Sequence, residues 1–176
     1  MNFALEVPLP ADVEELAAVH VRCWQEAYAD ILPTDYLAGL PVPDRAELWR
    51  RLIASPHVFK QVARVDGNIA GFITCGEPVD GAGLGADGEI HAVYVLKNYQ
   101  GHRIGRSLMA AAARFWLSRG GRKLIVLFFA ANEGAERFYR SLGGVQVYDG
   151  MHEFAGMAIA DRGLIFDDLA QLAAYP

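Results

Sequence analysis

The sequence predicts an α+β protein in which strands and helices alternate along the chain. Several short segments alternate apolar and polar residues or consist of β-branched residues, which is typical of strands. Other segments place apolar residues at helical spacing, and Gly, Pro and Asp-Gly separate the two kinds. The expected order is a strand, helices, three strands, a helix, a strand, a helix and two strands, which makes about seven strands.

The first half of the chain follows this order. Phe3, Leu5 and Val7 alternate and predict a strand that ends at Pro8. A helix follows from Ala11, and the apolar face that we expect it to bury consists of Val13, Leu16, Ala17, His20 and Trp24. Residues 28–56 carry Pro33, Pro41 and Pro43 and predict short helices joined by loops. Residues 58–65 and 69–75 predict two strands, which Asp66-Gly67 joins in a hairpin.

The second half continues the alternation. A Gly- and Asp-rich loop at residues 76–88 leads into a strand, and a strongly patterned helix covers residues 104–119 and stops at Gly120-Gly121. Residues 124–129 predict a buried strand, and Asn132 is a suitable N-cap for a helix that reaches Leu142. A last hairpin is expected from residues 145–148 and 153–159, turning at Asp149-Gly150.

Composition limits the class of protein. The chain has 176 residues, of which 53% are hydrophobic and 21% charged, so we expect one compact domain spanning residues 1–176. The net charge of −5 argues against nucleic acid as a partner. No apolar run approaches the ~20 residues of a membrane helix, so no membrane is expected. Cys23 and Cys75 lack metal or redox spacing, which favours a reducing cytoplasm, and the histidines predict no metal site.

The run from Asn98 to Arg106 is the strongest functional signal. It lies between a β-branched strand and the helix at 104–119, so the unpaired N–H groups and the positive dipole end of that helix favour a phosphate. Gly101 and Gly105 permit close approach, and Arg103 and Arg106 either meet the phosphates or are simply solvated. The spacing is not that of a P-loop. Residues 83–88 match GxGxxG, but they lead into a strand, which excludes a dinucleotide fingerprint.

Three segments carry a resemblance to one family. Gln100-x-x-Arg103-x-Gly105 is similar to the pyrophosphate loop of the GNAT superfamily of N-acetyltransferases, although Arg103 replaces the usual glycine. The segment from Asn132 to Gly143 resembles the family's second cofactor segment. The segment from Trp24 to Pro33 resembles the acceptor side of small bacterial members. The resemblance implies a twisted, mixed and mostly antiparallel sheet flanked by helices, with acetyl-CoA as the donor and no metal.

The resemblance also implies roles for particular residues. Acetyl-CoA would bind through the loop, a strand that pairs with the pantetheine arm, and one helix cap; these residues are Gln100, Gly101, His102, Arg103, Ile104, Gly105, Arg106, Val93, Tyr94, Val95 and Asn132. For Val93 and Val95, ordinary core packing is an equally good interpretation. Asn132 serves equally as a helix cap.

Acetyl transfer requires a base for the ammonium and an acid for the departing thiolate. Glu89, at the start of the strand before the loop, is the candidate base, and His91 on the same face is a rival or a partner. Tyr139 is the candidate acid because the family often has a tyrosine close to the cofactor sulfur; core packing is the alternative. Neither cysteine has a neighbouring base in sequence, so we read both as packing residues.

The acceptor is expected to be an amine bound by residues 24–52, the loop 76–88 and the last hairpin. Glu26, Asp30 and Asp35 would attract a cation, and Trp24, Tyr28 and Tyr36 would pack against it, although surface charge explains the acids too. The sequence leaves the kind of amine open. It favours an N-acetyltransferase acting by direct transfer over a non-catalytic acyl-CoA sensor, and family habit suggests a homodimer.

Overall fold

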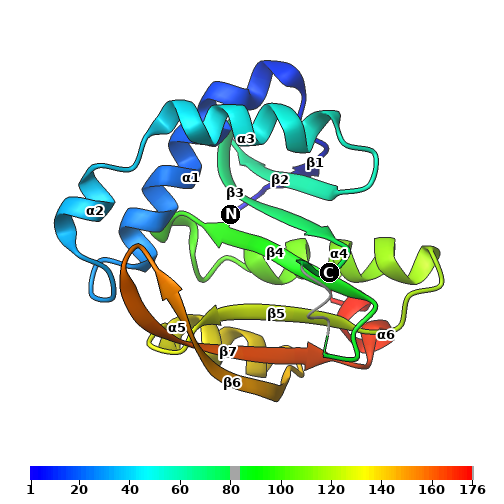
Figure 1. The fold of residues 1–176 in the computed structure, drawn as a ribbon. Coiled ribbons are helices and arrows are strands. Elements are labelled where there is room, and N and C mark those ends of the chain that lie inside the picture. The colour runs from blue at the N-terminus through cyan, green and yellow to red at the C-terminus, as the bar shows by residue number, and fades with distance from the viewer. Residues whose placement is uncertain (80–83, 176) are drawn as a thin grey trace. The chain divides into compact units, whose positions relative to one another are not determined.

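The computed structural model describes residues 1–79 and 84–175 (Figure 1). Its strands are β1 Ala4–Glu6, β2 Phe59–Val65, β3 Asn68–Gly76, β4 Gly88–Val95, β5 Leu124–Phe129, β6 Val145–Phe154 and β7 Met157–Phe166. Its α-helices are α1 Val13–Ala27, α2 Thr34–Ala38, α3 Val42–Ala54, α4 Ile104–Ser118, α5 Glu133–Ser141 and α6 Leu169–Ala173. The predicted order of elements is confirmed from β1 to β7, whereas helix α6 was not predicted.

The strands form a mixed sheet of seven, in the order β1-β2-β3-β4-β5-β7-β6. The β4–β5 pair is parallel, whereas the β1–β2, β5–β7 and β6–β7 pairs are antiparallel. This confirms the expected α+β architecture. Contacts divide the chain into two compact units, Met1–Thr74 with Ala92–Met109 and Cys75–His91 with Ala110–Pro176, and each is described by itself.

The first unit is built around an aromatic core. Figure 1 shows α3 running beside α1, and the apolar face predicted for α1 packs against α3 and β3. Trp49 and Phe72 are completely buried and meet edge to face with ring centroids 5.0 Å apart. Arg64 links β2 to β1 and to the residue before α1, because its guanidinium forms ion pairs with Glu6 and Asp12 at 2.9 and 2.6 Å.

His20 lies inside this aromatic core. Its ring is 4.9 Å from that of Phe72 and 5.8 Å from that of Tyr94, and the residue is 6% exposed. Burial, and then the positive charge of Arg45, lowers the pKa of His20 from 6.5 to about 3. The imidazole is therefore neutral in the folded protein at neutral pH and packs as an aromatic residue.

The second unit contains β5 and the long hairpin of β6 and β7. β5 pairs with β7 from Leu124–Phe166 to Phe129–Asp161, and β7 pairs with β6 over nine residue pairs. Helix α5 packs on this sheet through Tyr139, whose ring is 5.3 Å from Phe128 of β5 and 6.4 Å from Phe166 of β7. Gly88, the first residue of β4, belongs to this unit, and a Cβ atom at this position would lie 2.3 Å from the Trp116 ring of α4.

The prediction for the last hairpin was wrong in its turn and in its strand lengths. Asp149 and Gly150 lie inside β6, opposite Arg162 and Asp161, and the turn is at Ala155-Gly156, where φ is +50° and +76°. A two-residue turn of this kind needs positive φ at both positions, and Ala155 and Gly156 adopt it in this hairpin although Asp-Gly is the commoner sequence for such a turn. By contrast, the hairpin predicted at Asp66-Gly67 is confirmed, with φ of +49° and +83°.

Two further expectations concern the rest of the chain. Residues 80–83, in the predicted loop at 76–88, lie outside the described residues. Among the described residues, no helix combines the length and the hydropathy needed to cross a membrane.

The buried neutral histidine predicts a pH-dependent stability. The unfolded chain binds a proton at His20 below pH 6.5 and the folded chain does not until about pH 3, so stability falls as the pH drops through this window. Between pH 7 and pH 5 we expect this residue alone to remove about 2 kcal/mol from the free energy of unfolding. Urea unfolding at both pH values, compared between wild type and His20→Leu, measures the difference.

The exposed His57 supplies the control. His57→Leu makes the same chemical change outside the core and should keep the wild-type pH dependence. An equal pH dependence in His20→Leu and wild type would contradict the neutral, buried state of His20.

Candidate functional site

In the first unit, the predicted phosphate loop has the geometry of a strand–turn–helix junction. Helix α4 begins at Ile104, and its first hydrogen bond runs from Ser107 N–H to the Arg103 carbonyl at 3.0 Å. Before it, the Gln100 side chain donates to the Val95 carbonyl at 3.0 Å, which fixes the loop to the end of β4. His102 Nδ1 lies 2.9 Å from the Gln100 carbonyl oxygen. The loop is thus held by its own residues while its outer surface stays exposed.

Arg103 adopts the backbone conformation that glycine usually provides. Its φ is +68°, and that of Gly101 is +77°. A left-handed conformation costs a non-glycine residue about 1–2 kcal/mol, so the fold tolerates this strain rather than reshaping the turn. The Arg103 side chain is exposed and pairs with no carboxylate among the described residues. A Cβ on Gly101 would meet no atom within 4 Å, so the space above the loop is open.

Strand β4 leads into this loop. Its parallel register with β5 covers Gly88–Ile90, and Val93, Tyr94 and Val95 follow in the strand, half-buried. On the β3 side the backbones approach closely, since a Cβ on Gly71 would lie 2.6 Å from the Tyr94 carbonyl oxygen. The Tyr94 hydroxyl lies 2.6 Å from the Tyr28 hydroxyl. Tyr28, which was predicted to pack against the acceptor, is therefore buried against Tyr94.

In the second unit, Glu89 and His91 both contact the segment after β3. Glu89 is 8% exposed and its Oε2 accepts a hydrogen bond from Val79 N–H at 2.9 Å. His91 is exposed, and its Nε2 lies 2.9 Å from the Glu77 carbonyl oxygen. The two predicted proton-transfer residues therefore differ in environment: the carboxylate is buried and the imidazole is at the surface.

The cysteines are buried, as predicted. Burial, and then the negative charge of Glu89, raises the pKa of the Cys75 thiol to about 12. Burial, and then Glu26, raises the pKa of Cys23 to about 12 as well. A carboxylate thus does lie near Cys75, which the sequence did not reveal, but its effect is to keep the thiol protonated. A thiolate nucleophile is therefore disfavoured at both positions.

Helix α5 carries the remaining predicted residues of this unit. The Asn132 side chain caps the helix, with its Oδ1 accepting a hydrogen bond from Ala135 N–H at 3.0 Å, which confirms its predicted capping role. Tyr139 is 6% exposed and its ring packs against Phe128, Phe138 and Phe166. Core packing is therefore one role of Tyr139, and a role for its hydroxyl remains a prediction.

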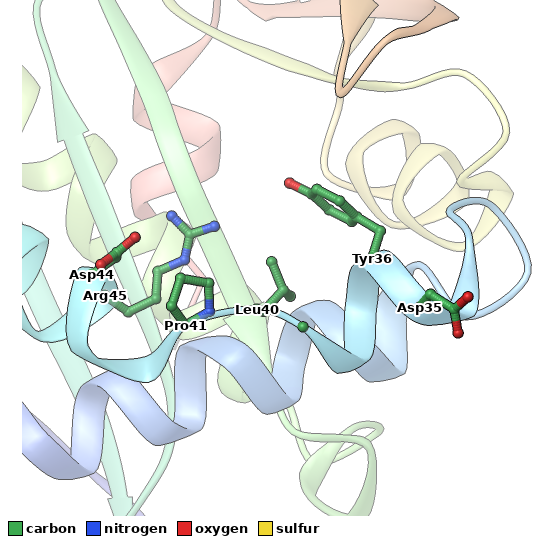
Figure 2. A pocket seen from close by; sticks show the side chains of 7 residues that line it. Asp35, Tyr36, Leu40, Pro41, Asp44 and Arg45 are labelled. Carbon is green, nitrogen blue, oxygen red and sulfur yellow. The ribbon is translucent and has the colours of Figure 1, made fainter.

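The acceptor segment of the first unit contains a cavity. Its volume is about 360 Å³ and it lies between α2 and α3 (Figure 2), lined by Asp35, Tyr36, Gly39, Leu40, Pro41, Asp44 and Arg45. Asp35 and Tyr36 were named for the acceptor side. Asp44 and Arg45 lie within the predicted range 24–52 but were not singled out, because nothing in their spacing distinguishes them from an exposed helix surface. Glu26, also predicted, pairs with Arg22 at 2.9 Å and accepts the Lys97 N–H at 2.7 Å.

Sequence reasoning also missed a pair on the β6–β7 hairpin. His152 Nδ1 lies 2.6 Å from Asp161 Oδ2, and the imidazole stacks on Phe129 at the end of β5. The two residues are nine positions apart on a hairpin whose turn was placed wrongly, so their pairing could not be read from the sequence. Among the described residues, no three His, Cys, Asp or Glu side chains form a metal-binding group.

Comparison with known proteins identifies the family. Residues 17–143 match the family model described as acetyltransferase (GNAT) family. The chain belongs to this family. A Bacillus subtilis protein described as the uncharacterized N-acetyltransferase YuaI is 30% identical over 161 residues, covering 92% of this chain and 91% of that protein. The protein is therefore an acyltransferase.

Solved structures support the fold. The PaiA N-acetyltransferase of Thermoplasma acidophilum, in complex with coenzyme A, has a TM-score of 0.72 at 18% identity and covers 92% of this chain and 98% of its own. The acetyltransferase YncA of Salmonella typhimurium, with its cofactor acetyl-CoA, has a TM-score of 0.68 at 17% identity, covering 95% of this chain and 94% of its own. At these identities the likeness shows the fold.

Proposed function

We propose that this acetyltransferase moves the acetyl group of acetyl-CoA to a primary amine by direct transfer in a ternary complex, with residues 1–176 acting as one domain. The observation that carries the proposal is the loop before α4. It keeps the positive-φ geometry at Gly101 and Arg103, leaves open space above Gly101 and ends in a helix N-terminus. Such a junction suits the pyrophosphate of coenzyme A. The family relatives described with coenzyme A and acetyl-CoA support the same donor.

The first unit would supply most contacts to the cofactor. The backbone and side chains of Gln100–Arg106 would hold the phosphates, with Arg103 exposed and unopposed by a carboxylate among the described residues. Val93, Tyr94 and Val95 would pair with the peptide-like amides of pantetheine, because they lie beyond the three β4–β5 pairs. Asn132 is also proposed to contact that arm through its side-chain amide.

The chemistry requires two proton transfers. The amine nitrogen attacks the thioester carbonyl carbon, the C–S bond breaks, and the amine proton leaves while the thiolate gains one. Glu89 would accept the amine proton, since one of its oxygens is held by Val79 N–H and its carboxylate is shielded from water. Tyr139 would protonate the thiolate, because a phenol with a pKa near 10 is protonated at neutral pH.

The loop predicts a selective effect of a small substitution. Gly101→Ala forces an alanine to φ near +77° and places a methyl group in the space above the loop. We expect acetyl-CoA binding, measured by calorimetry, to weaken at least about tenfold, with about 1 kcal/mol of stability lost. Titrations with ATP and NAD, neither of which should bind, test the specificity for acetyl-CoA.

Gly67 provides a matched control. It also has positive φ, +83°, and open space around a Cβ, but it lies in the β2–β3 turn. Gly67→Ala should cost similar stability and leave acetyl-CoA affinity unchanged. Equal affinities in Gly101→Ala and wild type would remove the loop from the cofactor site.

Tyr139→Phe separates the packing role from the catalytic role. The ring remains against Phe128 and Phe166, so the melting temperature and acetyl-CoA affinity should hold. Loss of the hydroxyl should lower kcat about 100-fold, as expected for a general acid. Tyr175→Phe removes a hydroxyl from a half-buried tyrosine near the C-terminus, outside the proposed site, and should leave kcat unchanged. Full activity in Tyr139→Phe would leave this residue with its packing role alone.

Glu89→Gln tests the base. Glutamine keeps an oxygen for Val79 N–H but cannot accept the amine proton. We expect kcat/KM at pH 7 to fall about 100-fold and to recover with rising pH as the amine loses its own proton. Pre-steady-state or initial-rate measurements between pH 6 and 10 would follow the recovery. A larger loss in His91→Gln than in Glu89→Gln would assign the base to His91 instead.

A further inference from the structure

Arg45 occupies an unusual position in the first unit. Its guanidinium carbon lies 4.8 Å from the centroid of the Trp24 ring, so the planar cation is stacked on an aromatic face. Among the described residues no carboxylate lies within ion-pair distance of it, although the neighbouring Arg50 of α3 pairs with both Glu14 and Glu47. Arg45 is half-buried and lines the cavity between α2 and α3. A held, half-buried guanidinium without an ion-pair partner among the described residues is suited to a carboxylate ligand.

The geometry of the cavity supports this interpretation. Figure 2 shows the Arg45 guanidinium and the Tyr36 ring extending from the backbone in the same direction, whereas the Asp35 carboxylate points away from them. Stacking on Trp24 occupies a face of the guanidinium and leaves the N–H groups at its edge available for the two oxygens of a carboxylate.

Charge and size then limit the ligand. Asp35 and Asp44 also line the cavity, and neither forms an ion pair within the described part of the chain. With one cation and two acids, the lining suits a zwitterion, whose carboxylate meets Arg45 and whose ammonium meets an acid, better than a doubly charged phosphate. The volume of about 360 Å³ is at the small end of ligand sites, about 300–1,000 Å³, which fits a metabolite.

We propose that Arg45 binds the carboxylate of the acceptor, so that this enzyme acetylates small amines that also carry a carboxylate, of the amino-acid class. The inference rests on the proposed acetyl transfer and names the acceptor class of that reaction. Arg45 is then a specificity-determining residue: it selects the acceptor and takes no part in the proton transfers.

The test compares each amino acid with its primary amide across the common side chains. The two ligands of a pair differ in the charge of one group while their shape is nearly the same. Wild type should show kcat/KM at least about tenfold higher for the acid of the preferred pair, and Arg45→Met should abolish this preference mainly through KM. Ethanolamine and phosphoethanolamine are included to detect a phosphate acceptor.

Arg51→Met is the matched control. Arg51 is exposed on the same helix and makes no ion pair among the described residues, so the variant makes the same chemical change outside the cavity. It should retain the preference for the acid. Arg45→Lys keeps the charge without the planar fork, and it should recover only part of the preference. Thermal melting of each variant verifies that it is folded.

Calorimetry with the same ligand pairs measures the binding affinity of each acid and each amide, and so tests the inference independently of turnover. Binding of an amino acid over its amide, lost in Arg45→Met and kept in Arg51→Met, supports it even if acetyl-CoA does not bind and the proposed function fails. Equal use of acids and amides, or a preference for phosphoethanolamine, overturns the inference while leaving acetyl transfer intact. Absence of binding and acetylation for every amino acid up to about 10 mM overturns it as well.

Discussion

The close packing of glycines around β4 is the constraint on which the rest of the structure depends. A Cβ at Gly71 would lie 2.6 Å from the Tyr94 carbonyl oxygen, and one at Gly88 would lie 2.3 Å from the Trp116 ring. Both approaches are closer than real Cβ contacts allow, so a larger residue would require the backbone to move at Gly71 and the Trp116 side chain to move at Gly88. This strand carries Glu89 and continues into the loop before α4. The positions of the proposed base and of the proposed cofactor contacts therefore depend on this packing.

Backbone strain at Arg103 is the second constraint on function. Holding an arginine at φ of +68° costs about 1–2 kcal/mol, which is a noticeable part of the stability of a domain of this size. The surrounding hydrogen bonds, from Gln100 to Val95 and from Ser107 to Arg103, maintain the turn. The strain places a cation at the N-terminus of α4. Glycine there would relieve the strain and remove that charge.

Part of the candidate site could be predicted from single residues, because local chemistry determines it. Asn132 caps its helix wherever the helix lies, and the loop at 98–106 follows a strand and opens a helix in both the sequence pattern and the structure. The cavity at Arg45 is different. It depends on how α2 and α3 turn relative to α1, and on the indole of Trp24 presenting a face to the guanidinium. Residue spacing carries no signal of such a contact.

The sequence by itself determined the order and type of the elements up to β7, the hairpin at Asp66-Gly67 and the position of residues 98–106 between a strand and a helix, since periodicity and turn residues are local properties. Only the tertiary structure decided whether Asp149-Gly150 or Ala155-Gly156 forms the turn of the last hairpin. Pairing of β6 with β7 across Asp149 and Gly150 keeps both strands continuous, so Ala155-Gly156 turns instead. It also decided that Tyr28 is buried against Tyr94 and that Arg45 faces a cavity. These outcomes depend on contacts between residues far apart in sequence, whose energies no local pattern records.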